Sequence, residues 1–367
     1  MIVPPVNFTP ILRETEAAWR THLSELFSRP HFILGPQLAA FEREWAAYLR
    51  TGFSAGVANG TDAIELSLRD AGITSPRQEV LTSALTAPFT GIGIVSAGCA
   101  IRFADIDEET LLMNPADAAA RVTRRTAAIV PVHLYGQPCD LRAFRALARK
   151  SGAVLVQDAC QAHGAQHRGQ PLAAYGPYTT YSFYPTKNLG ALGDGGSIVT
   201  NSPAINRRLR QWRDGGRRGG GQVSYFKGSN SRLDDLQCCY LRGFLTKLDE
   251  WNTDRRRLAT LYDQALAECD AVRAVKTSAE SVRHLYVIRT RRRDALRAHL
   301  TAQGISTGIH YPKPMHLMPA FAEAGLQRGD LPHAERACRE IVSLPLWPRM
   351  PDALVLRTAE AVTKFFA

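Results

Sequence analysis

The fold is decided by residues 127–157, which contain Ala127-Ala-Ile-Val-Pro-Val-His133, then Leu141–Lys150, then Ala153-Val-Leu-Val-Gln157. The first and third segments are short apolar runs, which are typical of buried strands. The middle segment has its apolar residues three and four apart, which is typical of a helix. A strand, a helix and a second strand in this order predict a βαβ unit with parallel strands.

The same alternation continues on both sides of this unit. Val80–Ile101 has no charged residue and is long enough to cross a bilayer, but it contains a proline and three glycines. We therefore predict a buried strand and a helix there, followed by a second strand at Ala100–Ala104. Further strands are expected at Tyr178–Tyr184 and Ser197–Thr200. The pattern predicts an α/β fold with a mostly parallel sheet covered by helices on both faces.

The alternation of strands and helices ends after residue 201. A long helical stretch from Leu233 to about Ala267 is expected to join two domains. Beyond it, His284–Arg289 predicts a strand and Asp294–Gln303 a helix, so the last hundred residues indicate a smaller α+β domain. We place the large domain at residues 1–245 and the small one at 246–367.

Composition excludes several classes of protein. The 367 residues are 45% hydrophobic and 22% charged, which rules out a disordered, collagenous or coiled-coil chain. The formal net charge of +11 favours anionic partners. Seven scattered cysteines without a CxxC pair indicate neither a disulfide framework nor a zinc site, so no metal is expected. No export signal is visible, and a cytoplasmic protein is expected.

Runs of arginine are the main basic feature of the sequence. They lie within residues 207–218, 255–257 and 291–293, and we interpret them as solvated helix faces and loops. They lack interleaved aromatic residues, and no nucleic-acid-binding motif accompanies them. Neither a nucleic acid nor a membrane is therefore expected as a partner.

Three features could carry chemistry. Lys187 follows a buried strand among small residues, where desolvation lowers the pKa of an amine, as a Schiff-base lysine requires. Asp158 ends a strand at the carboxyl edge of the sheet, where a carboxylate can keep a pyridine nitrogen protonated. Asn59-Gly60-Thr61 opens a helix whose N–H groups suit a phosphate, and the Ser182 hydroxyl could add to it.

Each feature also has a plain structural interpretation. Lys187 alone would be a surface lysine, Asp158 an N-cap, and Asn59-Gly60-Thr61 an ordinary helix start. Taken together, however, a lysine, a carboxylate and a phosphate cradle are the three demands of one cofactor, pyridoxal phosphate.

The chain resembles the DegT/DnrJ/StrS family of pyridoxal-phosphate-dependent sugar aminotransferases over nearly its whole length. The ordered set of matching stretches comprises Phe32-Ile-Leu-Gly-Pro36, Asn59-Gly-Thr-Asp-Ala63, Val132-His-Leu-Tyr-Gly-Gln137, Asp158-Ala-Cys-Gln-Ala-His-Gly164, Ser182-Phe-Tyr-Pro-Thr-Lys-Asn-Leu-Gly190, Asn230-Ser-Arg-Leu-Asp-Asp-Leu-Gln237 and Gly308-Ile-His-Tyr-Pro312. The resemblance implies the aspartate-aminotransferase-like fold, also called fold type I.

The resemblance also implies roles for individual residues. Lys187 matches the lysine that binds the cofactor covalently and shuttles the proton, and Asp158 matches the partner of the pyridinium nitrogen. Gln161 would lie near the cofactor ring. The phosphate contacts match Gly60, Thr61 and Ser182. Asn230 matches a residue that reaches the phosphate in the partner subunit, so a homodimer with shared active sites is expected.

The remaining candidate residues concern ring stacking and the substrate. Where many members have an aromatic residue on the cofactor, this chain has Ala87, so Phe89 either takes over the stacking or packs in the core. The substrate-binding candidates are Tyr184, His310 and Tyr311. In the glycine-rich loop, Arg217 and Arg218 are candidates for holding a substrate diphosphate.

The expected reaction moves an amino group from L-glutamate, which leaves as 2-oxoglutarate, to a nucleotide-linked keto-sugar, with pyridoxamine phosphate as the form of the cofactor that carries it. Tyr184 in its motif and the later Gly-Ile-His-Tyr-Pro resemble the family members that act on 3-keto sugars, and this resemblance favours a 3-keto-6-deoxyhexose linked to dTDP, as in natural-product biosynthesis. A 4-keto-sugar and a keto-cyclitol remain alternatives. Lys187 argues against the dehydrating relatives, which carry histidine there. A non-catalytic sensor or regulator is the alternative of another class.

Overall fold

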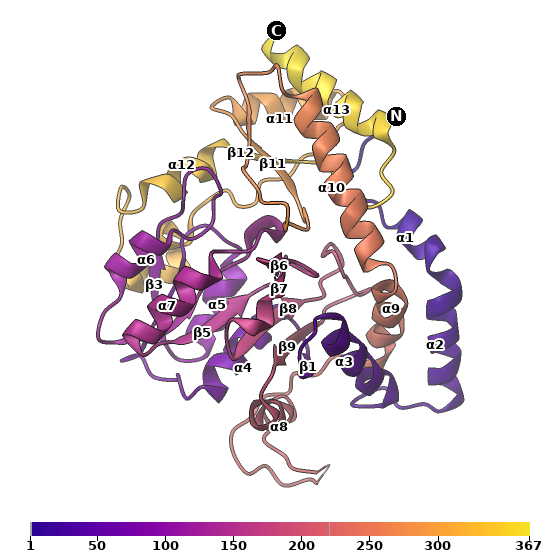
Figure 1. Cartoon of the computed structure of the whole chain (residues 1–367), viewed down its shortest axis with the longest axis vertical. Coiled ribbons are helices and arrows are strands. Elements are labelled where there is room, and N and C mark those ends of the chain that lie inside the picture. The colour runs from indigo at the N-terminus through magenta and orange to yellow at the C-terminus, as the bar shows by residue number, and fades with distance from the viewer. Residues whose placement is uncertain (1, 220) are drawn as a thin grey trace.

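A seven-stranded sheet forms the centre of the computed structural model, which describes residues 2–219 and 221–367 (Figure 1). Its strands, in spatial order, are β1 (Phe53–Val57), β9 (Gly196–Thr200), β8 (Tyr178–Ser182), β5 (Val154–Asp158), β4 (Thr126–Val130), β2 (Glu79–Ser83) and β3 (Ala100–Ala104). Only β9 pairs antiparallel with its neighbours β8 and β1, so the other six strands point the same way. The predicted mostly parallel sheet is confirmed.

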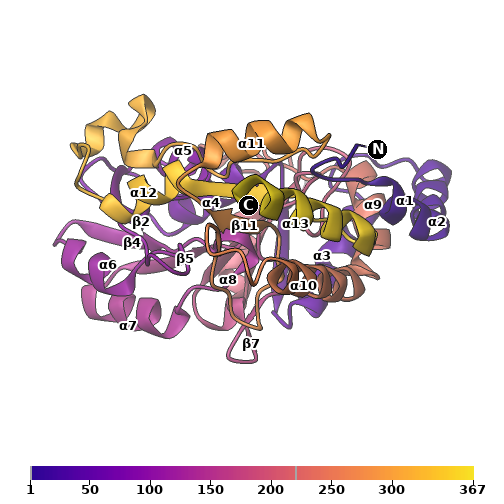
Figure 2. The same ribbon diagram turned by 90° about the horizontal axis from the view of Figure 1, so that it is seen from above.

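Helices cover both faces of this sheet (Figure 2). On one face α4 (Gly60–Asp70) contacts α5 (Pro88–Ser96) and α8 (Pro203–Trp212). On the other face α6 (Pro115–Arg121) contacts β3, and α7 (Leu141–Ser151) contacts β4 and β5. The uncharged segment predicted as strand, helix and strand is β2, α5 and β3, all inside the fold. Among the described helices, none is both long and apolar enough to cross a bilayer.

The predicted long helix between the two parts of the chain is wrong in one respect. It is broken into α9 (Asp235–Leu245) and α10 (Leu248–Ala265). The Thr246 hydroxyl donates to the carbonyl of Gly243 at 2.7 Å, which caps the first helix. After the break the two helices have different partners, because α9 packs on α2 (Glu16–Ser28) and α3 (Pro36–Tyr48) while α10 packs on α13 (Asp352–Phe366).

A three-stranded antiparallel sheet lies above the large one in Figure 1. It consists of β10 (Arg273–Ala274), β11 (Tyr286–Arg289) and β12 (Ile341–Leu344). The helices beside it are α11 (Arg293–Ala302), α12 (Pro332–Glu340) and α13. The amino-terminal Val3 is buried in the same core and exchanges backbone hydrogen bonds with residues 304 and 306. The boundary at residue 245 stays a prediction.

The remaining elements are short. They are α1 (Thr9–Glu14), the strands β6 (Gln166–His167) and β7 (Gln170–Pro171), and the 3₁₀ turns Leu134–Gly136, Leu172–Ala174, Met315–Leu317 and Pro319–Ala324.

Candidate active site

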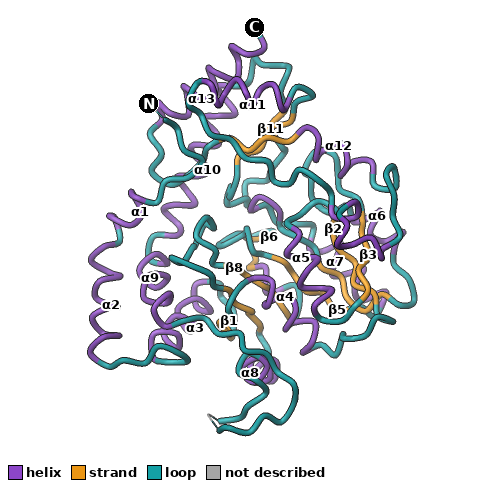
Figure 3. Tube along the Cα trace, turned by 180° about the vertical axis from the view of Figure 1, so that it is seen from behind, coloured by secondary structure: helices purple, strands orange, loops and turns teal. Residues whose placement is uncertain are grey.

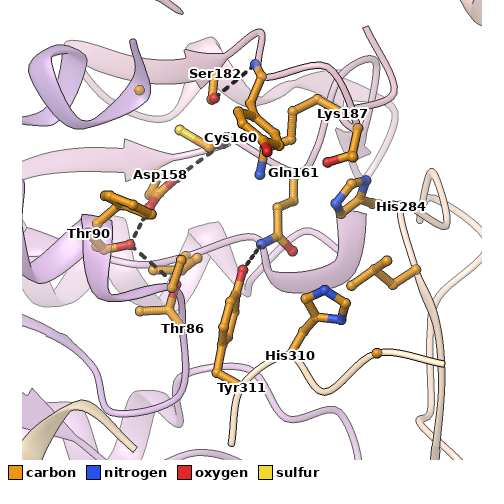
Figure 4. A pocket seen from close by; sticks show the side chains of 18 of the residues that line it. Thr86, Thr90, Asp158, Cys160, Gln161, Ser182, Lys187, His284, His310 and Tyr311 are labelled. Atoms are coloured by element: carbon orange, nitrogen blue, oxygen red, sulfur yellow. Dashed lines mark hydrogen bonds between the residues drawn. The ribbon is translucent and has the colours of Figure 1, made fainter. Parts of the chain in front are cut away.

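The carboxyl ends of the parallel strands form one wall of a cavity of about 960 Å³, and the small sheet closes the opposite side. Asp158 ends β5, Ser182 ends β8, and Gly60 begins α4, so these three elements deliver their residues to the same edge of the sheet. Ligands of open α/β sheets bind at this edge, because the loops and helix N-termini open there. Figure 4 shows the side chains that face one another across the cavity.

Asp158 is held by two hydrogen-bond donors, one close to it in sequence and one from a distant part of the chain. Its carboxylate is only 4% exposed. One oxygen accepts from the Thr90 hydroxyl at 2.7 Å, and the other accepts from the backbone N–H of Cys160 at 3.1 Å. The Thr90 hydroxyl lies 3.2 Å from that of Thr86, so a pair of threonines at the start of α5 stands behind the carboxylate (Figure 4). These bonds fix its orientation toward the cavity.

Lys187 lies in the turn that follows β8 and lines the same cavity. Its backbone N–H donates to the carbonyl of Tyr184 at 2.9 Å, which fixes the turn. Burial lowers the pKa of the amine, while the charges of Cys160 and Asp158 act in the opposite direction. The net result is an amine that gives up its proton more readily than an exposed lysine, as a nucleophile or proton shuttle requires.

The start of α4 forms a narrow cradle. The Asn59 side chain caps this helix by accepting from the N–H of Asp62 at 2.8 Å. A Cβ atom at Gly60 would lie 2.8 Å from both Cys160 Sγ and Ser182 Cβ, so only glycine fits there. Thr61 and Ser182 line the same space. The cradle therefore presents backbone N–H groups and hydroxyls, as an oxyanion site requires.

Gln161 connects the sheet edge to the Gly308–Pro312 segment. Its Oε1 accepts from the N–H of Tyr135 at 2.8 Å, and its Nε2 donates to the Tyr311 hydroxyl at 3.0 Å. Burial raises the pKa of Tyr311, so this phenol stays protonated. His310 Nδ1 lies 2.8 Å from the Ser343 hydroxyl, and burial together with the charge of Lys187 lowers its pKa. Both side chains line the cavity (Figure 4).

Tyr184 and Phe89 line the outer part of the cavity. Phe89 is 61% exposed and Tyr184 is 52% exposed. The core-packing interpretation of Phe89 is therefore wrong, while its stacking on a cofactor stays a prediction. An exposed aromatic at the rim leaves a face free for a ligand.

Three predicted residues lie outside this cavity. Arg217 bonds to Asp214, and the Arg218 guanidinium lies 4.4 Å from the centre of the Tyr225 ring. Asn230 lies beside a shallow depression formed by residues of the same loop. This segment, 213–219 and 221–230, projects at the bottom of Figure 1 and again in Figure 3, beyond α8. The roles of these residues stay predictions.

Sequence analysis missed a buried polar chain that joins the Lys187 turn to the small sheet. His284 Nδ1 lies 3.0 Å from Asn188 Oδ1, and Asn188 Nδ2 donates to Asn252 Oδ1 at 2.8 Å. Asn252 donates in turn to the carbonyl of His163 at 2.9 Å. No sequence spacing links these residues, because they come from four separate parts of the chain.

The cavity also contains Arg255, for which the prediction of a solvated arginine run is wrong. The residue lies on the inward face of α10 and is 3% exposed. Its helical position relative to Trp251 and Leu258, both buried, was the available signal. For metal binding, the described residues contain no group of three or more His, Cys, Asp or Glu side chains that could hold an ion.

The fold and the residues of this cavity define an aminotransferase. The chain belongs to the DegT/DnrJ/EryC1/StrS aminotransferase family, whose model matches residues 14–363. It is 39% identical over 366 residues to the dTDP-3-amino-3,4,6-trideoxy-alpha-D-glucose transaminase of Streptomyces venezuelae, covering 99% of this chain and 96% of the relative.

Solved structures support the same family assignment. The crystal structure of S. venezuelae DesV in complex with a ketimine intermediate matches with a TM-score of 0.96 and 39% identity, covering 99% of this chain and 98% of that one. The Bacillus subtilis NtdA structure with bound cofactor PMP matches with a TM-score of 0.89 and 28% identity, covering 98% and 85%. The expected family and fold type I architecture are confirmed. The family and the PMP-bound neighbour imply a pyridoxal-type cofactor.

Proposed function

We propose that this protein uses pyridoxal phosphate to transfer an amino group from L-glutamate to a nucleotide-diphospho-keto-sugar. We favour a dTDP-linked 3-keto-6-deoxyhexose as the acceptor. The observation that carries the proposal is that one cavity holds the half-buried Lys187, the oriented Asp158 and the Gly60 cradle. The Streptomyces venezuelae relative, named for a 3-amino sugar nucleotide, supports carbon 3.

The residues present fit the cofactor. Asp158 would hold the pyridine nitrogen, and Lys187 would hold the aldehyde carbon. The phosphate would occupy the cradle of Gly60, Thr61 and Ser182, where no Cβ blocks the helix N-terminus. Gln161 would lie at the ring. When bound, the cofactor supplies an electron sink for the negative charge that develops on the donor's alpha carbon.

The chain's own residues then divide the remaining work. Lys187, with its lowered pKa, takes the proton from one carbon and returns it to another. Asp158 stabilises positive charge at the ring nitrogen, and Thr90 and Cys160 keep its carboxylate in place. Tyr184, His310 and Tyr311 would contact the sugar, because they line the same cavity as Lys187 and Asp158.

We also infer a homodimer with shared active sites. Exposed apolar side chains gather around the start of α9, where the N–H of Asp235 bonds to Phe32 and Gln237 bonds to the N–H of Leu192. The group comprises Phe32, Ile33, Leu34, Leu192 and Leu236. A patch of this kind marks a protein interface. The loop that carries Asn230, Arg217 and Arg218 would then contribute to the cavity of the partner subunit.

The decisive test is a visible absorbance spectrum of the purified protein, followed by single-turnover addition of dTDP-3-amino and dTDP-4-amino sugars. We expect a yellow protein that is bleached by the 3-amino sugar. Bleaching by the 4-amino sugar alone would move the reaction to carbon 4. Bleaching by glutamate alone would direct the search to keto-cyclitols and other nucleotides. A protein that stays colourless with pyridoxal phosphate would overturn the proposal.

A further inference from the structure

Arg255 is a buried cation for which the fold supplies no counter-ion. Its guanidinium donates through Nη1 to two carbonyl oxygens, those of His284 at 3.1 Å and Leu346 at 3.2 Å. The Nε–H is buried and has no hydrogen-bond partner. Among the described residues, no carboxylate forms an ion pair with it. A guanidinium has five N–H donors, so these two bonds leave much of its capacity unused.

A second buried arginine shows what the same fold does when the role is structural. Arg213 is 4% exposed, close to the 3% of Arg255. Its guanidinium bonds to the carboxylate of Glu42 and to the carbonyl of Gly56. That pairing compensates the cost of removing a charge from water. Arg255 lacks it, and burial lowers its pKa to about 10.

The nearest acidic residue is not free to compensate Arg255. Asp254 precedes it on α10, and the charge of this carboxylate partly opposes the lowering of the Arg255 pKa. However, one oxygen of Asp254 accepts from Arg257 Nε at 3.0 Å, and the other accepts from the backbone N–H of Arg349. The Asp254 carboxylate therefore serves other donors, and Arg255 itself lines the cavity.

Arg255 is tied to the Lys187 turn by one short chain of contacts. The carbonyl of His284 accepts from Arg255, while the His284 ring meets Asn188, the residue next to Lys187. The positive charges of Lys187 and Arg255 both act to lower the pKa of His284, after burial. A ligand group bound at Arg255 would thus lie near the amine of Lys187. The contacts through His284 and Asn188 would keep the distance between them constant.

From this arrangement we infer that Arg255 binds a carboxylate of the amino donor. A carboxylate is compact enough to reach an enclosed guanidinium and matches its fork with two parallel hydrogen bonds. The Gly60 cradle already offers a separate site for a phosphate. The inference rests on the proposed function, because a donor such as glutamate must present its amino group at Lys187 while its carboxylate is held.

Binding of glutarate tests the assignment without turnover, because this dicarboxylate has no amino group to transfer. Calorimetry on the cofactor-loaded full chain would compare wild type, Arg255→Gln and the matched control Arg256→Gln. The control removes a charge from the next position of the same helix, where the side chain donates to the Thr253 hydroxyl and forms no ion pair with any other described residue. We expect Arg255→Gln to weaken glutarate binding roughly 10- to 100-fold, with the control and dTDP binding unchanged.

Two further measurements keep the test decisive. Arg255→Lys retains the charge without the fork, so it should weaken glutarate binding less than Arg255→Gln, and it replaces that variant if Arg255→Gln fails to fold. In the half-reaction with L-glutamate, Arg255→Lys should raise KM more than it lowers kcat. Unchanged glutarate binding in a folded variant would overturn the inference, as would weakening of dTDP binding alone, which would assign Arg255 to the diphosphate.

The wild-type protein separates this inference from the proposed function. If wild type reacts with glutamate while the Arg255 variants bind glutarate normally, only the role of Arg255 is wrong. If wild type reacts with no amino donor, the proposed function fails first.

Discussion

The cavity at the sheet edge and the 213–230 loop both carry predicted site residues, but the chain treats them differently. At the sheet edge, Asp158 and Ser182 end strands of the large sheet. The Asp158 carboxylate accepts from the Thr90 hydroxyl, and the Ser182 hydroxyl accepts from the backbone N–H of Tyr184. In the described part of the loop, Arg217 bonds to Asp214 and Arg218 stacks on Tyr225. The residues at the sheet edge meet in one cavity of the same chain, whereas Arg217 and Arg218 lie outside that cavity.

The difference shows which parts of the site a single chain completes. Strand ends in a packed sheet have little freedom, so their side chains are placed by the core. A projecting loop is placed by whatever it packs against, and for this loop we propose a second copy of the chain. Substitutions in the cavity should therefore leave the loop intact, and substitutions in the loop should leave the cavity intact.

The largest effect is expected for Lys187→Ala. The variant loses both the covalent attachment and the proton shuttle, so the single-turnover rate with L-glutamate should fall about 10⁴-fold. Stopped-flow absorbance of the cofactor measures it. Unfolding by urea should stay close to wild type, since the side chain faces the cavity. A fully active variant would contradict the assignment of Lys187.

The second largest effect is expected for a substitution in the 213–230 loop. Asn230→Ala should reduce activity roughly 10- to 100-fold if the side chain contacts a charged phosphate in the partner subunit. Dimers mixed from Asn230→Ala and Lys187→Ala chains contain one intact site per mixed dimer, so random mixing should restore about a quarter of wild-type activity. Mixtures that stay inactive would place both residues in the site of the same chain.

Within the cavity, Thr90→Val should lower kcat about 10-fold, because Asp158 loses its 2.7 Å hydroxyl donor without a change in side-chain shape. The matched control is Thr86→Val, which is one hydrogen bond further from Asp158 and should have a smaller effect. Equal effects of the two variants on kcat would exclude orientation of Asp158 by Thr90.

The smallest effect concerns stability rather than activity. Burial lowers the pKa of His133 to about 4 and that of His163 to about 3. Their ordinary value near 6.5 returns on unfolding, so the unfolded chain binds more protons below that pH. Stability is therefore complete above about pH 6.5 and is lost as the pH falls, by up to about 1.4 kcal/mol per pH unit for each histidine.

Urea unfolding at pH 7 and pH 5 measures this dependence. His133→Gln should reduce the difference in unfolding free energy between the two values of pH, because one of the buried groups no longer titrates. A variant with the full wild-type difference would show that His133 does not contribute.

Much of the fold could be predicted, and the errors have local causes. The strand–helix alternation predicted β2, α5 and β3 in a segment that could be mistaken for a membrane span. The helix predicted through residue 246 failed because helical periodicity continues across the break, while the Thr246 cap ends α9. Arg255 was assigned to a solvated run because its neighbours in sequence are charged, although its side chain faces inward on α10.

The sequence by itself determined the class of fold, the family and the ordered motifs around Asp158, Lys187 and Gly60, because apolar periodicity and short motifs are local properties of the chain. Only the tertiary structure decided that Thr90 supports Asp158, that His284 and Asn188 connect the lysine turn to the small sheet, and that Arg255 lines the cavity with no ion pair to a described carboxylate. These contacts join residues 29 to 96 positions apart. The physical reason is that packing, which sets such distances, depends on all the elements at once.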